Sequence, residues 1–142
     1  MTTLRGMTWN HTRGYLPMVA TAQRFTELHP DIAIVWEKRS LKAFEGFPVE
    51  KLAADYDLIV IDHPFSGYAA AHGPLLPLDG HLPAAFLADQ AANSAGQSHA
   101  SYHFAGHQWA LAIDAATPIA FWRDDLIKSL GLSVPKTWDD LL

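Results

Sequence analysis

The chain has 142 residues, a formal net charge of -5, no cysteine, and 49% hydrophobic against 18% charged residues. This composition is typical of one globular domain with a buried core, and it excludes a disordered chain, a disulfide scaffold and a thiolate metal site. The 10 basic residues are scattered rather than clustered, which argues against a nucleic-acid-binding surface, and no apolar run reaches the roughly 18 residues of a transmembrane helix.

The first part of the chain predicts alternating strands and helices. In chain order we expect a strand at 4–9, a helix at 15–28, a strand at 31–37, a helix at 48–54 and a strand at 56–62. Apolar residues within 15–28 recur at three- and four-residue spacing, as in an amphipathic helix. The run 58–61 is continuously apolar, as in a parallel strand with both faces covered. This order of elements predicts a doubly wound βαβαβ sheet of the α/β class.

The second part has a less regular pattern. In chain order we expect a short helix at 67–71, a loop at 73–80, a helix at 83–95, strands at 109–114 and 117–122, and a helix at 124–130 closed by Gly131. Residues 137–140 resemble a capping box that opens another helix, with Asp140 in place of Glu. A lone first turn is unstable, so we expect this chain to be cut from a longer one.

Polar and aromatic residues follow the predicted strands, where an open α/β sheet binds ligands. They are Trp9, Asn10, His11 and Arg13 after the first strand, Arg39 after the second, and Asp62 and His63 after the third. An aromatic face with amide, carboxylate and guanidinium groups suits a sugar-like or small carboxylated ligand. Three alternatives stay open: Trp9 caps the core, Asp62 caps a turn, and His63 orders the loop.

The sequence contains a regular histidine series but none of the usual catalytic motifs. His99, His103 and His107 are four residues apart, which on a helix would form a metal-binding face. Gly106 argues against a helix there, and the segment has no acidic residue, so we expect ordinary surface or core histidines and no metal or cofactor. The chain has no nucleophile elbow, Walker loop or dinucleotide-binding fingerprint, so we expect no enzyme.

The C-terminal third resembles a known family. Residues 109–126 look like the strand that crosses between the lobes of carbohydrate-type bacterial extracellular solute-binding proteins, followed by that family's aromatic strand and short helix. Residues 130–142 are similar to the same family's Gly-Leu-x-x-Pro-x-Thr-Trp-Asp-Glu-Leu stretch. The resemblance implies a type II periplasmic-binding-protein-like lobe at 1–114, then a hinge crossover and the beginning of a second lobe, largely missing, at 115–142.

The resemblance also implies a function and a site. Trp9, Asp62 and Asp114 would line the cleft between the lobes, and Trp122 would approach it from the hinge. We expect non-enzymatic binding of a small polar solute, first of all a carbohydrate, in the periplasm, for uptake through the membrane subunits of an ABC transporter. The exposed lobe interface predicts self-association, by exchange of the segment after Ala115.

Three other functions stay open. The first residues lack the apolar region of a secretory signal, which favours a cytoplasmic sensing module of the same fold. The polar loop after the first strand favours a small carboxylate or amino compound as the ligand. An enzyme that uses Asp62 and His63 is a third alternative.

Overall fold

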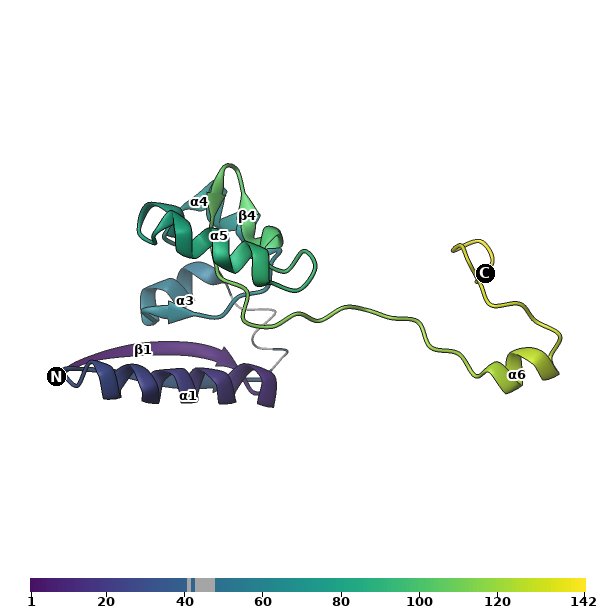
Figure 1. Ribbon diagram of the computed structural model, residues 1–142, viewed down its shortest axis with the longest axis horizontal. Coiled ribbons are helices and arrows are strands. Elements are labelled where there is room, and N and C mark those ends of the chain that lie inside the picture. The colour runs from purple at the N-terminus through teal and green to yellow at the C-terminus, as the bar shows by residue number, and fades with distance from the viewer. Residues whose placement is uncertain (41, 43–47) are drawn as a thin grey trace.

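A computed structural model describes residues 1–40, 42 and 48–142 of the chain. Its centre is a three-stranded parallel sheet in the order β2-β1-β3 (Figure 1). The elements of this unit are β1 (Thr2–Trp9), α1 (Thr12–Leu28), β2 (Ile32–Arg39), α3 (Val49–Asp55) and β3 (Leu58–Ile59). The parallel sheet with intervening helices confirms the predicted α/β class, and each of the five elements lies where the hydrophobic pattern predicted it.

The β1-α1-β2 unit is closely packed. β1 and β2 pair along their whole length, from Thr2 with Ile32 to Trp9 with Arg39. Two glycines permit this packing: a Cβ atom on Gly6 would lie 2.5 Å from the ring of Trp36, and one on Gly14 would lie 2.4 Å from the ring of Trp9. Both distances are far below ordinary contact, so each indole lies directly against the backbone and holds its element in place.

The third strand is shorter than predicted. The expected strand at 56–62 reduces to Leu58–Ile59, which pairs with Gly6 and Met7, although Val60 also donates a backbone hydrogen bond to the Met7 carbonyl (2.9 Å). The expectation that both faces are covered is wrong at Leu58, which is 37% exposed. α1 packs chiefly over β2 and β1. It therefore leaves the Leu58 side chain of β3 uncovered.

The core lies between β1 and α3. Met7 and Leu52 are buried at its centre, with Trp9, Tyr56 and Ile59 packed against them. Burying each such side chain contributes about 1.5–3 kcal/mol. Trp9 packs on this core and is also the last residue of β1. The core therefore fixes the position of the indole at the carboxyl end of the strand.

The following segment packs as helices and a small hairpin. Its elements are α4 (Phe65–His72), η1 (Leu78–Gly80), α5 (Ala84–Asn93), η2 (Ala100–Tyr102), β4 (His103–Phe104) and β5 (His107–Gln108). The helices expected at 67–71 and 83–95 are confirmed. The strand predicted at 109–114 is wrong: Trp109 is buried and its indole N–H donates to the Phe104 carbonyl (3.0 Å), so the hairpin holds this residue without a strand partner.

The histidine series does not form a helical face. His99 precedes η2, and His103 and His107 lie on opposite strands of the β4-β5 hairpin. Its turn places Ala105 and Gly106 at φ of 51° and 84°. No group of three or more metal-ligating side chains was found within the described residues.

Residues 118–142 extend away from the rest of the molecule (Figure 1). The strand predicted at 117–122 is wrong, because residues 115–123 are exposed and form no element. The helix predicted at 124–130 is confirmed as α6 (Asp124–Ser129). Gly131 at φ 65° follows it, and the Leu132 N–H donates to the Ile127 carbonyl (2.9 Å), which completes a Schellman motif.

The predicted capping-box contacts are also present. The Thr137 N–H donates to the Asp140 carboxylate (3.0 Å), and the Asp140 N–H donates to the Thr137 hydroxyl (3.2 Å). These reciprocal bonds satisfy two backbone donors, but the helix predicted to begin here is wrong: residues 136–141 form only bends and turns, since a lone first turn is unstable. Across the described part of the chain, no helix is both long and apolar enough to cross a bilayer.

Candidate functional site

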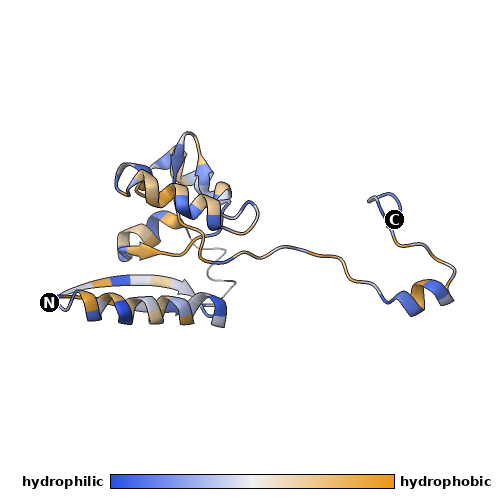
Figure 2. Cartoon of the chain, in the orientation of Figure 1, coloured by the Kyte–Doolittle hydropathy of each residue, from blue (hydrophilic) through white to orange (hydrophobic). Residues whose placement is uncertain are grey.

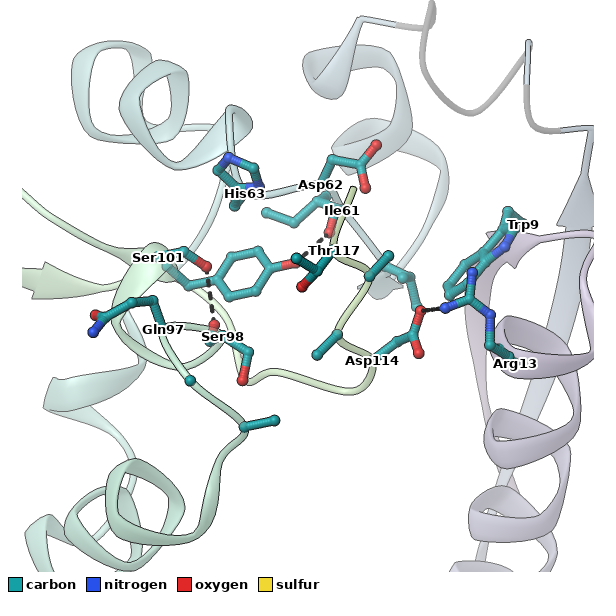
Figure 3. Close-up of a pocket in the computed structure, with 16 residues that line it drawn as sticks. Trp9, Arg13, Ile61, Asp62, His63, Gln97, Ser98, Ser101, Asp114 and Thr117 are labelled. Carbon is teal, nitrogen blue, oxygen red and sulfur yellow. Dashed lines mark hydrogen bonds and ion pairs between the residues drawn. The ribbon is translucent and has the colours of Figure 1, made fainter. Parts of the chain in front are cut away.

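A cavity of about 600 Å³ lies beyond the carboxyl ends of β1 and β3. Its walls come from the end of β1, the first turn of α1, residues 60–63 after β3, residues 95–98 after α5, η2, and residues 114–117. Figure 3 shows these segments, distant in sequence, converging on one space. The volume falls in the range of pockets that hold small molecules, and the position is the one where open α/β sheets bind ligands.

Five of the residues expected from the sequence line this cavity. They are Trp9, Arg13, Asp62, His63 and Asp114 (Figure 3). The parallel pairing of β1 with β3 brings the first and third strand ends together, which is why residues about fifty positions apart share one wall. For Trp9 the two alternatives are compatible, since the same indole packs on the core and faces the cavity.

Four other expected residues lie outside the cavity. The Asn10 N–H donates to the Arg39 carbonyl (2.6 Å), and the His11 side chain caps α1 by accepting from the Arg13 N–H (3.1 Å). The Arg39 guanidinium lies over the Tyr56 ring, 5.6 Å from its centre. Trp122 is exposed in the extended segment. Contact of these four with a ligand stays a prediction.

The structure adds residues that the sequence interpretation missed. Gln97, Ser98, Ser101, Tyr102 and Thr117 also line the cavity. Neither Tyr102 nor the polar run at 97–101 belongs to a motif that predicts ligand contact from the sequence. The available signal was this cluster of small polar residues after an alanine-rich helix, which is typical of a loop that contacts a ligand.

The cavity contains a half-buried phenol, the side chain of Tyr102. The Tyr102 hydroxyl donates to the Ile61 carbonyl (3.1 Å), which ties η2 to the segment after β3. Burial raises the pKa of Tyr102, and the negative charges of Asp62 and Asp114 raise this pKa further. Both carboxylates therefore act on the same region of the cavity.

An ion pair joins Arg13, near the start of the chain, to Asp114. Arg13 Nη1 lies 2.7 Å from Asp114 Oδ2, across 101 positions of sequence (Figure 3). The arginine side chain is about half exposed and the aspartate about one quarter exposed. This pair attaches the start of residues 114–117 to the first turn of α1, so that these residues form one wall of the cavity.

Taken together, the cavity provides aromatic surfaces, two carboxylates, hydroxyl groups and a paired guanidinium. Such a set can hold a polar molecule by stacking and by convergent hydrogen bonds.

Residues 8–142 match the family model of the bacterial extracellular solute-binding proteins. The mannitol-binding protein of Pseudomonas aeruginosa is 30% identical over 122 residues, an alignment that covers 82% of this chain and 27% of that protein. A solved structure of CpMnBP1 with mannotriose bound matches with a TM-score of 0.61 at 22% identity, over 99% of this chain and 36% of the other. The chain therefore spans about a third of the length of these proteins.

The structural match supports the fold, and the family model covers nearly the whole sequence. This family consists of solute-binding proteins. The chain belongs to the bacterial extracellular solute-binding protein family.

Proposed function

We propose that this chain is the N-terminal part of a non-enzymatic receptor that binds a small polar solute, a carbohydrate or sugar alcohol, in the periplasm. The membrane subunits of an ABC transporter would receive the solute. The observation that carries the proposal is the cavity at the strand ends, which combines the Trp9 indole with the carboxylates of Asp62 and Asp114. The name of the mannitol-binding relative supports the same solute class.

The proposal assigns the chain two parts. Residues 1–114 form the N-terminal α/β lobe, and residues 115–142 form the hinge crossover and the beginning of a second lobe. Trp9, Arg13, Asp62, His63 and Asp114 would contact the solute within the first lobe. Asn10, His11, Arg39 and Trp122 would contribute when a second lobe closes on it, as hinged two-lobed receptors do.

Calorimetric titration with D-mannitol and with mannotriose tests this function directly. We expect one of them to bind, and we expect Trp9→Ala to weaken that binding about tenfold, because the variant removes the stacking face of the cavity. Trp138→Ala is the matched control, since Trp138 is an exposed indole in residues 115–142. Absence of heat with both ligands, or equal affinity for wild type and Trp9→Ala, would argue against the proposal.

A further inference from the structure

The charges that line the cavity are unequal. Among the described lining residues, Asp62 and Asp114 are acidic and Arg13 is basic. The Arg13 guanidinium is already engaged by Asp114 at 2.7 Å. A carboxylate or phosphate entering the cavity would have to compete for this guanidinium and would still face the charge of Asp62.

Two of the four hydroxyl groups among the described residues that line the cavity already donate their hydrogen atoms to backbone carbonyls. The Tyr102 hydroxyl hydrogen is donated to the Ile61 carbonyl (3.1 Å), and the Ser101 hydroxyl hydrogen is donated to the Ser98 carbonyl (2.9 Å). Each hydroxyl oxygen keeps lone pairs that can accept a hydrogen bond from a ligand. Together with the two carboxylates, these groups make the cavity rich in acceptors, which suits a ligand that brings its own O–H or N–H donors.

Partial burial makes these charges effective. Asp114 is only about one quarter exposed, and the pKa of Tyr102 is raised by burial and then by both carboxylates. Charges in such a site are screened less than surface charges. An anion placed near Tyr102 would therefore be repelled, while a hydroxyl or ammonium group would be attracted.

We infer that this cavity accepts uncharged or cationic polyhydroxyl solutes and rejects their carboxylate and phosphate counterparts, with Asp114 as the residue that determines this specificity. Asp114 acts in two ways: its charge repels an anion, and its contact with Arg13 withholds the guanidinium that would otherwise bind one. The inference rests on the proposed function, because it assumes that a polar solute occupies the cavity.

Three ligands with one carbon skeleton provide the test. D-mannitol, D-mannonate and 1-amino-1-deoxy-D-mannitol differ only at one terminal carbon. This carbon carries a hydroxyl group in the first, is a carboxylate in the second and carries an ammonium group in the third. We expect the wild-type chain at pH 7 to bind the alcohol and the amine at least about tenfold more tightly than the carboxylate. In Asp114→Asn, which removes the charge and leaves at most a weaker neutral hydrogen bond to Arg13, we expect the mannonate-to-mannitol affinity ratio to rise about tenfold.

Two further variants separate specificity from structure. The exchange Arg13→Asp with Asp114→Arg retains an ion pair, so we expect the affinity ratio to return towards that of wild type. Glu27→Gln also removes one negative charge and breaks an ion pair, the one between Arg24 and Glu27 (2.9 Å), away from the cavity. We expect it to leave the ratio unchanged.

The affinity ratio makes the outcomes distinct. A purely structural role of Asp114 would weaken all three ligands equally and leave the ratio constant, which would overturn this inference. A wild-type preference for mannonate, or equal binding of mannonate and mannitol, would overturn it while supporting solute binding as such. If none of the three ligands nor mannotriose binds, the proposed function fails, and this inference fails with it.

Discussion

Residues 1–114 and residues 115–142 are both rich in apolar side chains, yet only the first region buries them. In the first region Met7, Leu52 and Ala69 are almost inaccessible to solvent. In the second, Phe121 is 86% exposed and Trp138 is 82% exposed, and Figure 2 shows apolar residues along this extended segment. Hydrophobic composition alone therefore does not form a core; a second packed layer is also needed.

The difference follows from what each region can pair with. β1, β2 and β3 satisfy one another's backbone groups, and α3 packs against β3 beside the buried Met7. Residues 115–142 contain only local order: the ion pairs Arg123–Asp125 and Asp124–Lys128 and the Schellman motif hold α6 within itself. Local bonds of this kind stabilise a turn of helix by a few tenths of a kcal/mol each and bury no surface.

The largest expected difference between the two regions is the loss of folding stability when a side chain is truncated. Met7→Ala removes a fully buried side chain, and we expect it to lower the free energy of unfolding by about 2–5 kcal/mol. Phe121→Ala, the matched truncation in the exposed segment, should change it by less than about 0.5 kcal/mol. Urea denaturation followed by circular dichroism, at a concentration where the chain is monomeric, measures both. Equal losses would show that the exposed segment packs in solution.

The exposed apolar residues of the second region also predict self-association of the chain. The exposed apolar residues of 115–142 have no partner in a single copy, so we expect concentration-dependent dimers formed by exchange of the segment after Ala115. Light scattering during gel filtration measures the mass across a concentration series. The double variant Phe121→Ser with Trp138→Ser should shift the equilibrium towards monomer by about tenfold or more. A strictly monomeric wild-type chain at high concentration would contradict this expectation.

The smallest expected effect concerns the acid stability of the region formed by η1 and the β4-β5 hairpin. The His107 imidazole, 3.0 Å from Asp79 Oδ2, and the Gln108 N–H, 2.9 Å from Asp79 Oδ1, lower the pKa of Asp79. A carboxyl whose pKa is lower in the folded than in the unfolded state contributes stability above about pH 4. This contribution is lost as the pH falls through the folded value.

Asp79→Asn retains an acceptor for the Gln108 N–H but loses the titrating charge. We therefore expect the melting temperature of wild type to fall more between pH 7 and pH 3 than that of the variant. Differential scanning calorimetry at the two pH values measures this difference. Parallel falls in both proteins would indicate that the Asp79 contacts do not form in solution.

Most of the elements were predictable because their signals are local. The three- and four-residue periodicity of α1, the glycine after α6 and the pairing of Thr137 with Asp140 each depend on neighbours within a few positions. The strands at 109–114 and 117–122 were predicted wrongly for the converse reason. Apolar residues suited to a strand form one only beside a partner strand, and among the described residues neither segment has such a partner.

The candidate site likewise combines features that local sequence predicts with contacts that depend on tertiary packing. The sequence by itself determined the α/β class and the strand ends at Trp9 and Asp62, because hydrophobic periodicity and element order are properties of the chain. Only the tertiary structure decided that Tyr102 and the 97–101 loop face those strand ends and that Arg13 pairs with Asp114. These contacts span 41 and 101 positions for Tyr102 with Ile61 and Arg13 with Asp114, and they arise from packing, which no local pattern encodes.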